Sequence, residues 1–204
     1  MTVIVASNSR LKRSTGSQDR LEAIFHTVDT IKSDLNKCGM RLQEARQFCA
    51  ITPFASTASS FTCTYGLAEK TLLENAVKGQ QSLKVAANEF FKKDKAVLIY
   101  DLAKQAWEMN EIKSMAETIH LRNSLQNDYP INSVAVALKK VEYKYYPAQR
   151  VLKRKADKGI FQPLLEEVSD FYVTFFPDSN SVLYRIEVKK KEQIRGYIFL
   201  LNLV

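Results

Sequence analysis

Apolar residues between Leu21 and Cys49 recur at alternating steps of three and four, the spacing of one face of an α-helix. The run comprises Leu21, Ile24, Val28, Ile31, Leu35, Cys38, Leu42, Ala45 and Cys49. It predicts a long helix that begins near Asp19, where Glu22 completes the spacing of a capping box. Pro53 is expected to end this helix, because its ring disfavours a helical conformation in the preceding residue.

The same helical spacing returns in the segment from residue 67 to residue 126. Its apolar positions are Leu73, Val77, Leu83, Ala87 and Phe91, followed by Leu98, Leu102, Ala106, Met109, Ile112, Ala116 and Ile119. We expect two helices here, with a break at Lys92–Lys95 and Asp94 as a cap. Residues 18–126 are therefore predicted to form a three-helix antiparallel bundle or a coiled-coil hairpin. A flexible arm, residues 1–17, is expected to precede it.

Residues 127–204 are predicted to form a basic α+β region. The segment 132–146 fits either element, because Val134, Val136 and Leu138 alternate as in a strand while Val134, Leu138 and Val141 share a helical face. Residues 147–159 predict a short helix, with Pro147 at its first position and Gly159 after its last. Residues 163–171 predict another.

The clearest β signal lies at the end of the chain. The runs FYVTFF, SVLYRIEV and IRGYIFLLNLV are rich in aromatic and branched residues, and PDSN and KKKEQ join them. They predict a three-strand antiparallel meander. The expected fold class is accordingly α+β, with N-terminal long helices first and a small sheet last.

Composition adds a preference for acidic partners. The 204 residues carry a formal charge of +8 with a pI of about 9.3, which favours nucleic acid, anionic lipid or an acidic protein surface. The longest apolar run, GYIFLLNLV, is too short to span a bilayer. Three cysteines without a CxxC pair argue against a disulfide framework. We therefore expect a soluble, cytoplasmic protein.

The chain contains no motif that is diagnostic of catalysis, of a cofactor or of a metal. His26 and His120 stand in neither HxxxH nor HExxH spacing, and none of the six glycines belongs to a phosphate-binding loop. Cys63, in a loop rich in Ser and Thr, is the one thiol expected to be exposed. We predict no catalytic, cofactor-binding or metal-binding residue.

A basic, tyrosine-rich stretch from Lys139 to Lys158 is the strongest candidate surface for a polyanion. Arg150, Lys153, Arg154 and Lys158 have helical spacing, so they are expected to share one face. If residues 141–145 form a strand instead, Tyr143 and Tyr145 are expected to pack in the core. The nucleic-acid candidates are Lys139, Lys140, Lys144, Tyr146, Arg150, Lys153, Arg154 and Lys158.

The leading hypothesis is a non-enzymatic assembly or adaptor protein that uses long amphipathic helices for self-association or for binding a partner protein. Each buried Leu or Ile is worth about 1.5–3 kcal/mol, so the apolar stripe must be covered by a partner, by a second copy or by the core of a bundle. The predicted contact residues, the helix seam, are Leu21, Ile24, Val28, Ile31, Leu35 and Leu42. The alternative is a protein that binds RNA or single-stranded nucleic acid. A membrane-active helical protein is a weaker alternative, and a membrane is the least expected partner.

Overall fold

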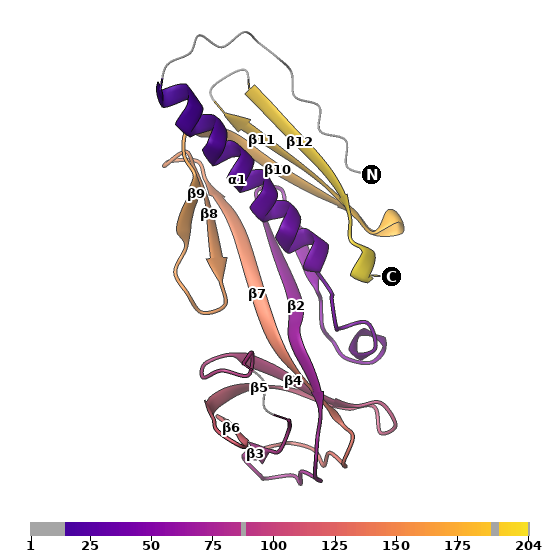
Figure 1. Ribbon diagram of the computed structural model, residues 1–204. Helices are drawn as coiled ribbons and strands as arrows, with labels where there is room; N and C mark the ends of the chain where they lie inside the picture. The colour runs from indigo at the N-terminus through magenta and orange to yellow at the C-terminus, as the bar shows by residue number, and fades with distance from the viewer. Residues whose placement is uncertain (1–14, 87–88, 189–191, 204) are drawn as a thin grey trace. The chain divides into compact units, whose positions relative to one another are not determined.

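The computed structural model describes residues 15–86, 89–188 and 192–203. Across these residues the chain forms one α-helix, α1 (Thr15–Lys37), and twelve β-strands (Figure 1). Two compact units interleave along the sequence. Unit 1 consists of Met1–Cys38, Phe54–Cys63 and Val141–Val204, and unit 2 consists of Gly39–Pro53 and Thr64–Lys140. The long strands β2 (Ser60–Thr71) and β7 (Val134–Tyr146) contribute residues to both units.

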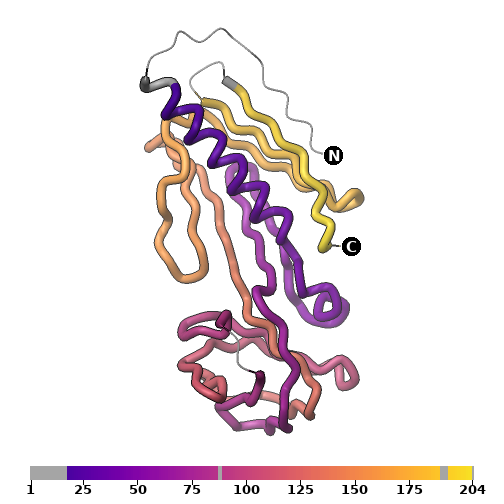
Figure 2. The backbone as a smooth tube through the Cα atoms, in the orientation of Figure 1, coloured from indigo at the N-terminus to yellow at the C-terminus, as the bar shows by residue number. Residues whose placement is uncertain are grey.

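Unit 1 combines α1 with two groups of strands. One group contains β1 (Phe54–Thr57), the first part of β2, the last part of β7, β8 (Val151–Ala156) and β9 (Gln162–Leu165). The other is an antiparallel sheet in the order β10 (Val168–Phe176), β11 (Ser181–Val188), β12 (Glu192–Phe199). The helix packs against β9, β12 and the 3₁₀ turn η4 (Leu201–Leu203). Figure 2 shows the indigo and yellow parts of the chain lying side by side in this unit.

Aromatic rings join the two groups of strands in unit 1. Phe61 of β2 stacks on Tyr143 of β7 with ring centroids 4.4 Å apart, and it lies 6.4 Å from Phe171 of β10. Phe54 of β1 lies 5.1 Å from Phe175 of β10. Such rings bury 150–250 Å² each, so this layer supplies much of the core of the unit.

The apolar stripe predicted for the first helix is present on α1. The prediction that other helices cover this stripe is wrong. Ile24, Val28, Ile31 and Leu35 are buried within unit 1 against strands rather than helices. The described residues contain no second α-helix with which to form a coiled coil or a bundle. The prediction of an N-terminal long-helix bundle is therefore wrong.

The helix also ends earlier than Pro53, at Lys37. Gly39 and Arg41 have φ angles of 78° and 58°, which a continuing helix does not allow. The N–H of Gly39 donates to the carbonyl of Thr64 at 3.0 Å instead of to a helical carbonyl. Leu42 and Ala45 remain buried in an irregular segment around η1 (Ala45–Gln47), so the apolar spacing outlasts the helix.

Unit 2 is a sheet with a core on each face. Its strand order is β2, β7, β4 (Ala96–Asp101), β5 (Ala106–Met115), β6 (Ile119–Leu121), β3 (Ser82–Leu83). Side chains alternate between the faces, as a strand requires. Val97 and Ile99 of β4 point into one core, whereas Leu98 and Tyr100 point into the other, which the segment around η1 covers.

Within the described part of residues 67–126, where two helices were predicted, the chain forms strands joined by turns and irregular segments. The error has a physical cause: residues four apart lie on the same side of a strand as well as of a helix, so a spacing of four does not separate the two. The run from Val97 to Tyr100 is typical of a strand. Lys92–Lys95 is a turn rather than a break between helices, and Asp94 adopts a φ of 65° there.

The structure of the last third of the chain decides between strand and helix for residues 132–146. It also shows that the two short helices predicted after this segment are not formed. Residues 134–146 form a strand, β7. The predicted helix 147–159 is a turn, the strand β8 and a second turn, with Arg150 and Asp157 at φ angles of 53° and 50°. The predicted helix 163–171 is divided between β9 and β10, and Glu167 adopts a φ of 59° at the bend. The antiparallel meander predicted for the C-terminal residues is present as β10, β11 and β12.

Three predicted features lie outside the described residues: the first fourteen residues of the arm, Ala87 of the second apolar series, and the lysines Lys189–Lys191. Within the described part of the chain, no helix has the length and apolar character needed to cross a bilayer.

Candidate ligand-binding site in unit 1

A buried polar cluster joins the helix of unit 1 to its strands. Tyr143 donates from its hydroxyl to Oδ2 of Asp34 at 2.6 Å, and Arg154 donates from Nε to the same oxygen at 2.8 Å. Arg154 Nε also lies 3.2 Å from the Tyr143 hydroxyl oxygen. Asp34 is 4% exposed and Tyr143 is fully buried. A buried carboxylate of this kind is stable only with a cation and hydrogen-bond donors beside it.

Local structure explains why these three residues meet. Tyr143 of β7 and Arg154 of β8 are directly opposite each other in the antiparallel register, so their side chains emerge on the same face. Asp34 lies on α1 between the buried residues Ile31 and Leu35, on the face that the helix turns toward the strands.

The protonation states follow from the surroundings. Burial raises the pKa of Tyr143 above its usual range, and the negative charge of Asp34 raises it further, so the phenol keeps its proton and donates. Burial lowers the pKa of Arg154, but the hydrogen bond to Asp34 and the adjacent charges outweigh it and raise the pKa overall. The guanidinium therefore stays charged and is held in one orientation by two neighbours.

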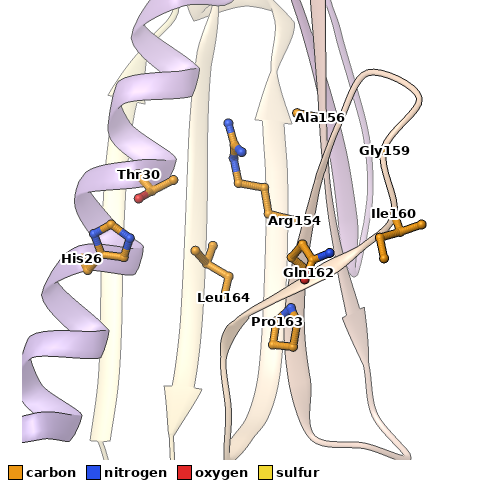
Figure 3. Close-up of a pocket in the computed structure, with 9 residues that line it drawn as sticks. All are labelled: His26, Thr30, Arg154, Ala156, Gly159, Ile160, Gln162, Pro163 and Leu164. Atoms are coloured by element: carbon orange, nitrogen blue, oxygen red, sulfur yellow. The ribbon is translucent and has the colours of Figure 1, made fainter.

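A cavity of about 530 Å³ lies beside this cluster, and Arg154 forms part of its wall. Figure 3 shows His26 and Thr30 entering from α1, with the guanidinium of Arg154 directed toward the helix. The cavity is lined by His26, Thr30, Arg154, Ala156, Gly159, Ile160, Gln162, Pro163 and Leu164.

The lining combines apolar walls with a few polar groups. Ile160, Pro163 and Leu164 supply aliphatic surface, while Thr30 and Gln162 supply hydrogen-bonding groups. The lining set contains a guanidinium and no carboxylate. Both hydrogen bonds of Arg154 described above use Nε, and a guanidinium has four further N–H groups. The cavity is therefore suited to a ligand in which a hydrogen-bond acceptor is attached to an apolar group.

The basic candidates within unit 1 do not share one face. Lys139 and Lys140 are assigned to unit 2, and the other candidates are assigned to unit 1. Lys144 and Lys153 are opposite each other on the outer face of β7 and β8, with Nζ atoms 5.4 and 4.7 Å from the ring centroid of Tyr146.

The remaining basic candidates lie elsewhere in unit 1. Arg154 projects from the opposite face of β8, and Arg150 and Lys158 lie in the turns that flank this strand. The helical face that was expected to unite the four residues does not exist, because this segment is a strand. Tyr143 and Tyr145 are buried, as the strand alternative predicted.

The residues of the predicted helix seam are covered by the chain itself. Ile24, Val28, Ile31 and Leu35 are buried in unit 1, Leu42 is buried in unit 2, and Leu21 is half-buried. The hypothesis of an assembly protein built on long helices is therefore wrong. The structure gives no support to the nucleic-acid and membrane alternatives either, and the helical face expected for Arg150, Lys153, Arg154 and Lys158 is not formed.

Two further sequence expectations concern single residues. Cys63 is fully buried rather than exposed, and its thiol donates to the carbonyl of Asp34 at 3.3 Å. His26 lines the cavity, whereas His120 lies in β6 of unit 2. No group of three or more His, Cys, Asp or Glu side chains that suits a metal ion occurs among the described residues.

Sequence reasoning missed Asp34, Thr30 and Gln162. A signal existed for Asp34, because it stands within the apolar stripe between Ile31 and Leu35. A carboxylate near the buried face of a helix indicates a buried partner.

Comparisons with known proteins place the chain in no family. No family model matches it, and no curated protein matches it. Among solved structures it is similar in part to the gp54 tailspike of the Acinetobacter baumannii bacteriophage AP22, determined in complex with A. baumannii capsular saccharide. The likeness covers 38% of this chain and 15% of that chain at 21% identity, with a TM-score of 0.32. A match of that extent indicates neither a fold family nor a function.

Proposed function

We propose that the protein is a non-enzymatic binding protein whose cavity in unit 1 receives a carboxylate attached to an aliphatic group. The observation that carries the proposal is Arg154, a charged guanidinium that lines the cavity and is fixed by Asp34 and Tyr143. Ligand pockets of about 300–1,000 Å³ with apolar walls and a few placed polar groups are the usual sites for small ligands, and this cavity has that character.

Arginine suits this role because its planar guanidinium matches the two oxygens of a carboxylate. Its anchoring by Asp34 reduces the side-chain entropy that binding would otherwise cost. The same anchoring neutralises part of its charge, so we expect weak binding for a simple carboxylate. A partner protein that offers an acidic side chain beside an aliphatic one has the same chemistry as a free carboxylic acid, and we propose it as the macromolecular ligand.

A nuclear magnetic resonance titration with hexanoate tests the proposal, with hexanamide as the uncharged matched probe. Hexanoate is expected to shift the backbone amide signals of residues around Thr30, Arg154 and Leu164, with a Kd of about 1 mM. Hexanamide is expected to bind at least about tenfold more weakly, because it lacks the charge that the guanidinium recognises.

Two variants locate the site. Arg154→Gln should abolish the preference for hexanoate over hexanamide. Ile160→Asp, at a position that is 76% exposed, should weaken hexanoate binding by about fivefold through charge repulsion without disturbing the core. Ile131→Asp is the control, because it adds the same charge at an exposed position of unit 2 and should leave binding unchanged. Equal binding of the two probes, or shifts confined to unit 2, would contradict the proposal.

A further inference from the structure

Two of the three cysteines lie together in the core of unit 1. Cys38 follows the last residue of α1 and Cys63 lies in β2, and both are fully buried. The thiol of Cys63 donates to the carbonyl of Asp34 at 3.3 Å, in the last turn of α1 before Cys38, and the neighbouring Cys38 side chain contributes to a raised pKa of Cys63. Two buried thiols that the fold brings together are the arrangement from which a disulfide can form.

A backbone hydrogen bond next to the pair holds the two chain segments together. The residue before Cys38 ends a helix whose inner face is buried, and the N–H of Gly39 donates to the carbonyl of Thr64 at 3.0 Å. The residues that follow the two cysteines are thus hydrogen-bonded to each other. Two chain segments that are far apart in sequence are therefore held next to each other beside the two cysteines.

We propose that Cys38 and Cys63 are a covalent modification site and form an intramolecular disulfide when the chain folds in the presence of a small-molecule disulfide such as oxidised glutathione. One protein thiol, after losing its proton, attacks a sulfur of the oxidant and releases one glutathione thiol. The second protein thiol loses its proton and displaces the other glutathione. Two protein thiols are oxidised to one disulfide, and one oxidised glutathione is reduced to two thiols.

The burial of the pair determines when the exchange takes place. Burial raises the pKa of Cys63 far above its ordinary value, and the contact with Cys38 raises it further, so the folded protein contains almost no Cys63 thiolate. Oxidation should therefore be slow once unit 1 is folded and rapid when oxidised glutathione is present during folding.

Cys49 is the remaining thiol and provides the internal control. It lies in unit 2, and burial raises its pKa to about 11. An odd number of cysteines with no short spacing argued against a disulfide framework at the level of the sequence. The fold removes that argument, because it pairs two cysteines and leaves the third in another unit.

The test is to refold the full chain from denaturant, once with oxidised glutathione and once with a reductant. After refolding with oxidised glutathione, thiol titration in denaturant should find one free thiol, at Cys49, and peptide mass mapping should find Cys38 linked to Cys63. The oxidised protein should melt about 5–10 °C above the reduced one, because the cross-link restricts the unfolded chain.

Single variants complete the experiment. Cys49→Ala should form the same cross-link and show the same difference in melting temperature between oxidised and reduced protein. Cys38→Ala and Cys63→Ala should each lose the cross-link and melt alike with or without reductant. Three free thiols after refolding in oxidised glutathione, or a cross-link that includes Cys49, would overturn the proposal. None of these outcomes depends on whether the cavity binds a carboxylate.

Discussion

Unit 1 and unit 2 each bury a carboxylate beside a tyrosine, but they surround it differently. Asp34 in unit 1 accepts from Arg154 at 2.8 Å and from Tyr143 at 2.6 Å. Glu108 in unit 2 accepts from the backbone N–H of Gln126 at 2.8 Å and from the hydroxyl of Tyr129 at 3.4 Å.

The two arrangements have different consequences. Glu108 joins β5 to the loop that contains Gln126, and its hydrogen bonds described here come from uncharged donors. Asp34 instead orients a guanidinium that continues into the wall of a cavity. The acid of unit 2 only joins elements of the fold, whereas the acid of unit 1 fixes the cation on which the proposed binding site depends.

The largest expected effect comes from removing the acids. Asp34→Ala leaves Arg154 partly buried without its counter-charge, so the free energy of unfolding should fall by about 3 kcal/mol. Glu108→Ala leaves only neutral donors unsatisfied and should cost about 1–2 kcal/mol. Urea unfolding measures the loss of stability in both variants. Circular dichroism reports on α1 in unit 1, and the fluorescence of Trp107 reports on unit 2. Equal losses would remove the distinction between the two clusters.

A pair of glycines compares the packing of the units. Gly196 of β12 is opposite Tyr184 of β11, and a methyl group there would overlap the buried phenol ring. Gly196→Ala should therefore destabilise unit 1 by about 2 kcal/mol. At Gly79 in unit 2 a methyl group meets open space, but the φ of 88° disfavours alanine, so Gly79→Ala should cost about 1 kcal/mol. The urea midpoints of the two variants test whether Gly196→Ala is the more destabilising. A smaller effect at Gly196 than at Gly79 would show that the Tyr184 ring can move aside.

The two tyrosines that donate to the acids give a smaller contrast. Tyr143→Phe removes a 2.6 Å hydrogen bond to a charged acceptor and should cost about 1.5 kcal/mol. Tyr129→Phe removes a 3.4 Å contact and should cost about 0.5 kcal/mol. The same urea series measures both, with the hexanoate titration as a second readout. Only Tyr143→Phe is expected to weaken hexanoate binding, because Arg154 then loses one of its two anchors.

The sequence predicted some of these elements and could not predict others. The alternation of three and four from Leu21 to Leu35 predicted a helix, and that helix is present, but the same alternation continues to Cys49 in a segment that is not α-helical. The steps of four around Leu98 are common to helix and strand, and the region forms strands. The C-terminal meander was predicted correctly because its aromatic and branched runs are bounded by turn residues.

The site required the fold before it could be identified. Arg154 was recognised as a basic residue, but the helix assumed for its segment gave it the wrong neighbours. Its pairing with Asp34 and the contact between Cys38 and Cys63 join residues that are distant in sequence. Spacing along the chain contains no information about such contacts, because the antiparallel register of β7 and β8 and the position of α1 create them.

Tyr184 is a buried tyrosine of unit 1 whose hydroxyl has no hydrogen-bond partner among the residues that the structure describes. Tyr184→Phe keeps the ring that covers Gly196, so near pH 7 the free energy of unfolding should change by less than about 0.5 kcal/mol. Burial raises the pKa of Tyr184 to about 12, with a further contribution from the charge of Asp29.

In the unfolded chain this tyrosine ionises near pH 10. Its contribution to stability is thus complete below about pH 10 and is lost as the pH rises toward 12, because only the unfolded form releases the proton in that window. Urea unfolding at several alkaline pH values should therefore show the wild type losing stability faster than Tyr184→Phe. If the two proteins lose stability in parallel as the pH rises, the Tyr184 hydroxyl must be in contact with water. Tyr184 would then differ from Tyr143 in being hydrated rather than in lacking a hydrogen-bond partner.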